Sequence, residues 1–296
     1  LWEKESCNTI RYIFTPDAAT PNLTSYEPIT GRISVDYLVN SAARNVIYTS
    51  PDAPENGSGT RDNPKDLRAA LISALPGQSI IMLDGTYSPL EELLIPRNVS
   101  GTADAMITLM AETTGNATVN GANLDSSSSL FTLVGSYWHV YGIEFCDTPG
   151  KCVNVSGNNN IIEMCTMHDS ANAGVQISRY SEEPNDKELW PSNNLIKNCE
   201  SYNHCDPGRS DADGFAAKLT CGEGNVFDGC ISHHNIDDGW DLYAKATTGS
   251  IGQVVVKNCV TYSNGWLLED EDSFNVPREG TEYGEGNGFK LGGENM

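Results

Sequence analysis

The sequence predicts an all-β protein built as a right-handed parallel β-helix, a solenoid of stacked coils. Strand-sized apolar segments recur along the chain with almost no helical periodicity between them. They take two alternating forms, one that ends around a cysteine and one that contains a glycine followed by a large apolar residue. The cysteines of the first form are spaced by 34, 31 and 29 residues. Constant strands with loops of varying length are typical of a solenoid, whereas a β-sandwich would not need the same motif on successive turns.

The first 45 residues do not follow this pattern. Pro16, Pro21 and Pro28 stand there among polar residues, and no strong period is present. We therefore divide the chain into an N-terminal extension, or the remnant of an upstream module, at 1–45 and a parallel β-helix domain at 46–296.

A single amphipathic helix is predicted ahead of the repeats. Segment 45–50 is typical of a strand, 64–75 of a helix with Pro64 at its first position, and 77–87 of a buried strand closed by a turn. Leucines repeat on one face of the helix, at Leu67, Leu71 and Leu75. We expect this N-terminal helix to cap the open end of the coil stack.

The cysteine-bearing segments predict ladders along the axis. Four of them align by their cysteines: 160–167, 194–201, 225–232 and 254–261. Coils of a β-helix stack at the spacing of hydrogen-bonded strands, about 4.8 Å, so equivalent positions lie above one another. The expected buried ladder consists of Ile143, Cys165, Cys199, Cys230 and Cys259. A corner ladder of amides is expected from Asn235 and Asn264.

The glycine-bearing segments predict a ladder that faces outward. They align on Gly174, Gly214, Gly239 and Gly288. If the residue after each glycine points inward, the next one points outward. These inward residues are Val175, Phe215, Trp240 and Phe289, and the outward ones are Gln176, Ala216, Asp241 and Lys290. Asp213 and Asp238, each just before its glycine, then lie one rung apart. With Asp237 and Asp241 added, four carboxylates converge on one patch.

Such a patch predicts a calcium site. Repulsion among four carboxylates would raise their pKa values and destabilise the coil unless a cation neutralised them. A dication that accepts about six to eight oxygen ligands with flexible geometry, Ca²⁺, suits a carboxylate-only set better than Mg²⁺ or Zn²⁺. The nearby His233 and His234 are not expected to bind zinc, because adjacent strand positions face opposite sides. The alternative is that each Asp-Gly pair is an ordinary turn.

Lys290 is the candidate base. It occupies the position of Asp241 on a later turn, and an ammonium beside bound calcium has its charged form disfavoured, which lowers its pKa from about 10.4. A surface lysine paired with Asp241 is the alternative. Lys218 also faces outward and is a rival base or a contact for a substrate carboxylate. Weaker candidates for binding an anionic sugar are Arg179, Arg209 and Lys245.

Composition limits the partners. Forty acidic residues against eighteen basic ones give a net charge of −22. This argues against nucleic acid or anionic membranes, because both need basic surface, and an acidic substrate would need a bridging cation. No apolar run is long enough to span a bilayer. Nine cysteines lack the close spacing of a zinc site, and Cys146 with Cys152, and Cys205 with Cys221, are candidate disulfides.

The segments ADGFAAK, NIDDGWDLY and GNGFKLGG, in that order, resemble polysaccharide lyase family 9, whose members are pectate lyases and some rhamnogalacturonan lyases. The resemblance runs from about Ile47 to the end. It implies secretion by a bacterial degrader of plant matter. It also implies that Lys290 is the Brønsted base and that the calcium ligands are Asp213, Asp237, Asp238 and Asp241. The chain departs from the family in the long, partly acidic segment 246–285. Family members also continue with several coils beyond the position of Met296, so C-terminal coils are expected to be missing here.

The expected reaction is β-elimination from a uronate. Calcium binds the carboxylate of the +1 sugar and stabilises the enolate that forms when Lys290 removes the C5 proton, after which the C4 oxygen leaves. We expect a monomeric, calcium-dependent, endo-acting pectate lyase on polygalacturonate, located outside the cell, in the periplasm or on the cell surface. Three alternatives stay open: a rhamnogalacturonan I lyase, an inverting pectin glycoside hydrolase, and a non-catalytic carbohydrate-binding β-helix with structural calcium.

Overall fold

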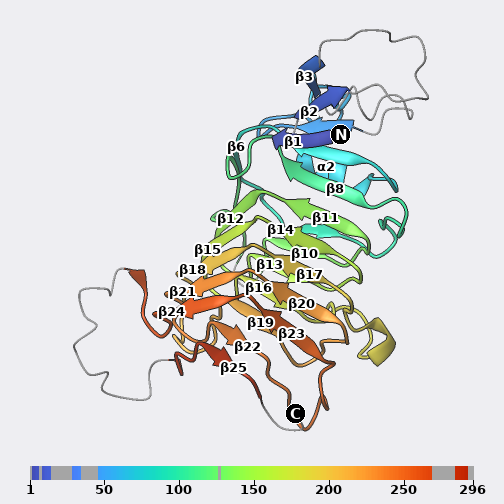
Figure 1. The fold of residues 1–296 in the computed structure, drawn as a ribbon. Coiled ribbons are helices and arrows are strands. Elements are labelled where there is room, and N and C mark those ends of the chain that lie inside the picture. The colour runs from blue at the N-terminus through green and yellow to red at the C-terminus, as the bar shows by residue number, and fades with distance from the viewer. Residues whose placement is uncertain are drawn as a thin grey trace.

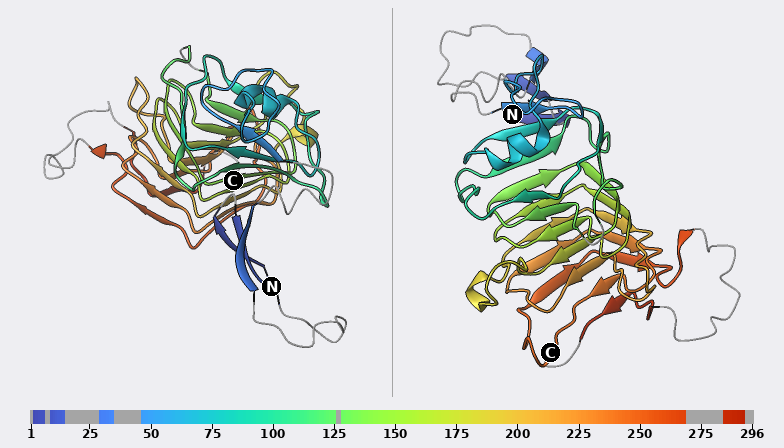
Figure 2. Two further views of the ribbon diagram at one scale, coloured as in Figure 1. Left: turned by 90° about the horizontal axis from the view of Figure 1, so that it is seen from above. Right: turned by 180° about the vertical axis from the view of Figure 1, so that it is seen from behind.

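Three parallel sheets wind around one core in the computed structural model, which describes residues 2–6, 9–14, 29–34, 46–125, 128–268 and 284–292 (Figure 1). Each coil contributes one strand to each sheet, so strands that are neighbours in a sheet come from successive coils. Seen from above, successive coils overlie one another (Figure 2). The predicted all-β, parallel β-helix architecture is confirmed.

The strands divide among the sheets in a regular order. The first sheet contains β4 (Val46–Thr49), β5 (Ser79–Met82), β8 (Ile107–Ala111), β11 (Trp138–Tyr141), β14 (Ile161–Glu163), β17 (Leu195–Lys197), β20 (Asn225–Asp228) and β23 (Val254–Lys257). The second contains β6 (Gly85–Tyr87), β9 (Ala117–Asn120), β12 (Ile143–Thr148), β15 (Thr166–Ser170), β18 (Glu200–Tyr202), β21 (Ile231–His233) and β24 (Val260–Tyr262). The third contains β7 (Leu93–Ile95), β10 (Phe131–Leu133), β13 (Val153–Val155), β16 (Val175–Ile177), β19 (Phe215–Ala217), β22 (Trp240–Asp241) and β25 (Phe289–Lys290).

The core is made of inward ladders. The predicted ladder of Ile143 and the four cysteines lies in the main apolar cluster, with Cys259 partly buried at its end. Aromatic rings stack in the same way: the ring centroids of Phe215 and Trp240 are 4.8 Å apart, and those of Trp240 and Phe289 are 5.0 Å apart. The inward direction predicted for these residues is therefore confirmed, and it turns the residues beside them outward.

The capping helix is present but shorter than expected. α2 (Leu67–Ile72) begins after Asp66, whose carboxylate accepts a hydrogen bond from the backbone N–H of Ala69 at 2.8 Å. Leu67 and Leu71 are buried in the main core, whereas Leu75 is 61% exposed and lies outside the helix. Pro76 follows Leu75 and disfavours the helical conformation there, which accounts for the early end. A 3₁₀ turn, η1 (Lys187–Leu189), lies in one of the loops.

Asparagine amides join successive coils at two corners. The expected pair is confirmed, because Asn235 Nδ2 donates to Asn264 Oδ1 at 2.9 Å. A second ladder was not predicted: the backbone N–H of Asn160 donates to Asn194 Oδ1, and that of Asn194 donates to Asn225 Oδ1. These amides pair backbone groups that would otherwise be buried without partners at the corners.

Strands lie where the sequence showed no strong period, and one expectation, the disulfides, is corrected. Within the first 45 residues, where no strong period was recognised, β1 (Trp2–Ser6), β2 (Thr9–Phe14) and β3 (Ile29–Ser34) pair as an antiparallel sheet. Neither candidate disulfide forms, because Cys146, Cys152 and Cys221 carry free thiols. The Cys152 thiol instead donates to the carbonyl of Phe145 at 3.4 Å, as a small buried group does. No helix among the described residues is long and apolar enough to cross a membrane.

Candidate metal centre and active site

The third sheet brings the predicted outward residues into register. Gln176 pairs with Ala216, Ala216 with Asp241, and Asp241 with Lys290. The backbone N–H of Gly174 donates to the carbonyl of Asp213, and that of Gly214 to the carbonyl of Asp238. The two aspartates that precede the glycines therefore lie one coil apart, as the alignment predicted.

The glycine after each aspartate is required by close packing against the second sheet. A Cβ on Gly214 would lie 2.0 Å from Ser232 Oγ, and one on Gly239 would lie 2.2 Å from Thr261 Oγ1. Ser232 Oγ in turn donates to the carbonyl of Gly239 at 3.1 Å. The Asp-Gly pairs are thus held where the third sheet begins, and the carboxylates point away from the core.

Four carboxylates gather at this edge. Oxygen atoms of Asp213, Asp237 and Asp238, one from each, lie within 4.8 Å of one another. Asp241 joins them through Lys218, whose Nζ lies 2.7 Å from Asp213 Oδ2 and 3.0 Å from Asp241 Oδ2. All four aspartates are buried, none being more than 5% exposed. The predicted convergence is present in the structure.

The carboxylate oxygens of this patch differ in their hydrogen bonds. Asp238 Oδ1 accepts hydrogen bonds from the backbone and side-chain nitrogens of Asn287, both at 2.9 Å, and Asp237 Oδ1 accepts from the backbone N–H of Glu285 at 2.7 Å. Asp241 Oδ1 is buried and accepts no hydrogen bond from the described residues, whereas the buried Asp238 Oδ2 lies 3.1 Å from Lys290 Nζ. A set made only of carboxylates, with a buried oxygen that accepts no hydrogen bond, fits a hard cation that prefers oxygen ligands, such as Ca²⁺.

Burial disfavours the charged form of these groups. It raises the pKa of Asp213 to about 7, although Lys218 opposes the shift, and raises the pKa of Asp237 to about 6 with help from the charge of Asp238. The pKa of Asp238 is also raised by burial, against the pull of Lys290. Such a cluster is most stable when protonated or when a cation occupies it.

Lys290 lies against the carboxylates. Its Nζ is 3.1 Å from Asp238 Oδ2 and 3.4 Å from Glu285 Oε2, and it lies over the ring of Tyr243. Although burial acts in the opposite direction, the charges of Asp241 and Asp238 raise the pKa of Lys290 above its usual range. A dication bound by the same aspartates would offset their negative charge, and the pKa of Lys290 would then fall.

An open cavity of about 350 Å³ lies over this patch. Of the predicted lysines, Lys218, Lys245 and Lys290 all line it. Gln176, predicted as an outward residue of the same ladder, lines it as well. Other lining residues were not predicted: Lys151, Asn172, Ser210, Asp211 and Tyr243. The alignment could have identified Lys151. Val153 belongs to the same inward ladder as Phe215, and Lys151 precedes Val153 by two residues, as Asp213 precedes Phe215.

Arg179 and Arg209 are not brought into this cavity. Arg179 Nη1 donates to the carbonyls of Tyr180, Ser181 and Glu183, which ties the side chain to its own loop. Arg209 lines a different cavity, beside Asp147 and Asp169.

The two histidines do not face opposite sides, as was predicted from their adjacent positions. His233 Nδ1 and His234 Nδ1 lie 2.7 Å apart, and the two rings meet edge to face. The reason is the backbone of His234, which has a φ of 54° and turns out of the strand.

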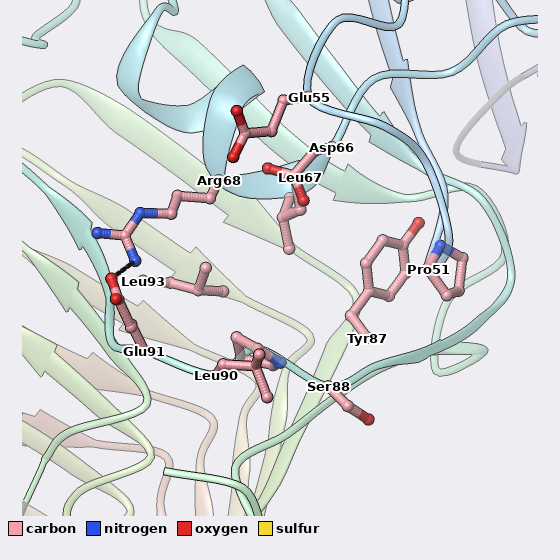
Figure 3. Close-up of a pocket in the computed structure, with 11 residues that line it drawn as sticks. Pro51, Glu55, Asp66, Leu67, Arg68, Tyr87, Ser88, Leu90, Glu91 and Leu93 are labelled. Atoms are coloured by element: carbon pink, nitrogen blue, oxygen red, sulfur yellow. Dashed lines mark hydrogen bonds and ion pairs between the residues drawn. The ribbon is translucent and has the colours of Figure 1, made fainter. Parts of the chain in front are cut away.

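A second cavity, of about 470 Å³, lies beside the capping helix (Figure 3). Leu67, Tyr87 and Leu93 contribute its apolar side, and Arg68 forms an ion pair with Glu91 at its edge. It shares no lining residue with the cavity over the aspartates. The chemistry described above therefore belongs to the third sheet alone.

Known proteins with similar sequences indicate the family of this chain. Residues 47–296 match the model of the Pel9A-like, right-handed β-helix region, which confirms the predicted handedness. Pectate lyase L of Thermoclostridium stercorarium is 44% identical over 99% of this chain, and pectate lyase L of Paenibacillus polymyxa is 34% identical over 96% of it. The chain spans only 23% and 62% of the lengths of these two relatives.

Solved structures agree on the fold. Pectate lyase Pel9A superposes with a TM-score of 0.68 at 29% identity, over 83% of this chain and 59% of that one. A rhamnogalacturonan lyase superposes with a TM-score of 0.63 at 23% identity, over 85% of this chain and 63% of that one, a likeness of fold alone.

Proposed function

Because the chain belongs to the Pel9A-like right-handed β-helix family, we propose that it is a pectate lyase that cleaves polygalacturonate by β-elimination and requires calcium. The observation that carries this proposal is the patch of four buried aspartates with Lys290 beside it. Similarity to proteins named pectate lyase supports the same substrate class. The acidic polymer would be met outside the cell, so we propose a secreted, monomeric protein.

The four aspartates would hold the calcium ion. Asp213, Asp237 and Asp238 already have oxygens close together, and Asp241 Oδ1 is a buried oxygen without a hydrogen bond from the described residues. Bound calcium would supply positive charge for the substrate carboxylate as negative charge builds up on it. Lys218, which now contacts Asp213 and Asp241, compensates part of the negative charge when the cation is absent.

Lys290 would take the proton from C5 of the uronate. Its Nζ lies at the edge of the aspartate patch and lines the open cavity, so it can meet a sugar whose carboxylate lies on that patch. Proton removal needs the neutral amine, and the negative field of Asp238 and Asp241 must therefore be compensated first. This requirement makes the base active only in the cation-loaded protein. The C4 oxygen then leaves, and a double bond forms between C4 and C5.

Lysines along the cavity would bind substrate carboxylates. Lys218 and Lys245 line it together with Lys290, and an acidic polymer needs such cations to approach a chain of this net charge. Neither Arg179 nor Arg209 lines this cavity, so their proposed contacts with the polymer stay predictions. The open form of the cavity favours a long polymer that runs through the site, and hence endo-cleavage.

Product chemistry tests this proposal against its rivals. Polygalacturonate, rhamnogalacturonan I and a neutral pectic galactan are each incubated with the protein, and both ultraviolet absorbance and reducing ends are followed. We expect absorbance from an unsaturated uronate with polygalacturonate, and early products of mixed length. Reducing ends without absorbance would indicate a hydrolase, preference for rhamnogalacturonan I would change the substrate, and binding without turnover would indicate a non-catalytic module.

A further inference from the structure

A mixed cluster of metal-binding side chains lies on a different face of the molecule, on the second sheet. Glu144 and Cys146 are two residues apart in β12 and point outward, because Ile143 and Phe145 between and before them are in the core. In the next coil, His168 of β15 pairs directly with Cys146. The three side chains therefore form a triangle that the sheet register fixes.

Their ligand atoms are close enough to share one ion. One atom each from Glu144, Cys146 and His168 lie within 4.8 Å of one another. Glu144 Oε1 is 2.8 Å from His168 Nε2. Cys146 is 3% exposed and the His168 side chain 15%, whereas the Glu144 side chain is 30% exposed.

Each of the three side chains is also oriented by a neighbour. His168 Nδ1 lies 2.6 Å from Asp169 Oδ2, which leaves Nε2 to face Glu144. Glu144 Oε2 accepts a hydrogen bond from Thr118 Oγ1 at 2.9 Å, and Asn120 Nδ2 approaches the Cys146 sulfur at 3.6 Å. A carboxylate on the far nitrogen of a histidine is the usual support of a metal-bound imidazole.

We propose that Glu144, Cys146 and His168 form a zinc site, with the fourth position of the ion left for water. A thiolate, an imidazole and a carboxylate are borderline or soft ligands, which suit zinc, whereas calcium takes oxygen ligands only. None of the three lines the cavity over the aspartates. The site is thus separate from the proposed calcium centre, and it does not depend on the proposed lyase activity.

Zinc would tie two coils together across the sheet. Glu144 and Cys146 belong to β12 and His168 to β15, so one ion would add a link between strands that already pair in the sheet. Asp147 and Asp169, the sequence neighbours of Cys146 and His168, line a cavity of about 560 Å³. Without metal, burial and Asp147 raise the pKa of the Cys146 thiol to about 12, so binding must release its proton.

Cobalt spectroscopy tests the site directly. Co²⁺ is added to the full chain saturated with calcium, so that the aspartate patch is already occupied. We expect about one equivalent to bind with a thiolate-to-cobalt charge-transfer band in the near ultraviolet, which Zn²⁺ then removes. Asp169→Asn keeps all three ligands and should weaken binding about 10- to 100-fold, because it removes the support of His168.

Matched variants decide the assignment. Cys146→Ser should abolish the band and His168→Gln should weaken binding. Cys259→Ser, which removes a partly exposed thiol outside the cluster, should leave both unchanged. Zn²⁺ should raise the Tm of the wild type but not of Cys146→Ser, whose folding is checked by circular dichroism. No thiolate band in the wild type, or a band that persists in Cys146→Ser, would overturn the proposal. If Cys146→Ser does not fold, His168→Gln and Asp169→Asn carry the test.

Discussion

Lys290 is the residue on which the proposed chemistry depends. Its Nζ lies 3.1 Å from Asp238 Oδ2, at the edge of the aspartate patch. Lys290→Ala should lower kcat on polygalacturonate by about 10²- to 10⁴-fold, the usual contribution of a positioned base. Lys290→Arg should not restore activity, because a guanidinium stays protonated. Initial rates measured at saturating substrate check both variants.

Lys257→Ala is the control for that series, because Lys257 pairs with Asp228 on the first sheet and does not line the cavity over the aspartates. It should retain wild-type rates. Comparable activity in Lys290→Ala and the wild type would remove Lys290 from the mechanism and return Lys218 as the candidate base.

The aspartates predict a pH dependence of calcium binding. Burial raises the pKa of Asp213 to about 7 and that of Asp237 to about 6, both above the ordinary value for the unfolded chain. In the calcium-free protein, the unfolded chain therefore loses these protons first, and stability falls as pH rises from about 4 towards 7. Calcium binds the ionised form, so its affinity should fall as pH drops through this range. Calcium should raise Tm strongly at about pH 8 and little at about pH 5.

Scanning calorimetry with and without calcium measures both effects. Asp241→Asn removes one ligand and should reduce the stabilisation by calcium at about pH 8. An equal shift of Tm by calcium at both pH values would contradict the assignment of Asp213 and Asp237 as ligands.

At the scale of elements, the Asp-Gly corner links the second and third sheets. A Cβ on Gly239 would lie 2.2 Å from Thr261 Oγ1 and 2.6 Å from the carbonyl of Gly288, so the corner must shift to accept it. Gly239→Ala should displace Asp238, weaken calcium binding by at least tenfold and lower Tm. Gly292→Ala is the control, because no atom lies within 4 Å of its added Cβ. Isothermal titration with calcium measures the difference, and unchanged affinity in Gly239→Ala would show that the corner does not position the ligands.

The register of the third sheet was the part of the site that the sequence alone could predict. Asp-Gly and Asn-Gly pairs recur before a large apolar residue, and a solenoid converts equal positions into neighbours, so Asp241 and Lys290 were placed correctly. Equal positions in the repeats do not predict where a side chain lies once the backbone leaves the strand. The φ of 54° at His234 brings its ring onto that of His233, and Pro76 ends the helix near Ile72. Loop residues such as Arg179 follow their own hydrogen bonds, which no repeat predicts.

At the scale of the whole molecule, one buried histidine makes the coil stack sensitive to acid. His204 is fully buried, with Nδ1 2.7 Å from Ser170 Oγ and Nε2 2.9 Å from Ser201 Oγ. Burial lowers its pKa from 6.5 to about 3. Below pH 6.5 the unfolded chain therefore binds a proton that the folded protein does not bind. The contribution of His204 to stability falls as pH drops, by about 2 kcal/mol at pH 5, opposite in sign to the contribution of the calcium-free aspartates.

Urea unfolding of the wild type and of His204→Gln at about pH 7.5 and pH 5 isolates this contribution, because the aspartates respond to pH equally in both proteins. His204→Gln keeps a neutral group that can both donate and accept, and it should be less stable than the wild type at pH 7.5 but lose less stability on acidification. The same loss in both proteins would show that other groups set the acid limit.

The proposed β-elimination requires both calcium and Lys290, and one measurement tests this double requirement. The absorbance of unsaturated uronate is followed on polygalacturonate after chelation and again after calcium is restored, for the wild type and for Lys290→Ala. We predict absorbance only in the calcium-restored wild type. Wild-type absorbance that persists in excess chelator, or equal absorbance from Lys290→Ala, would contradict the account.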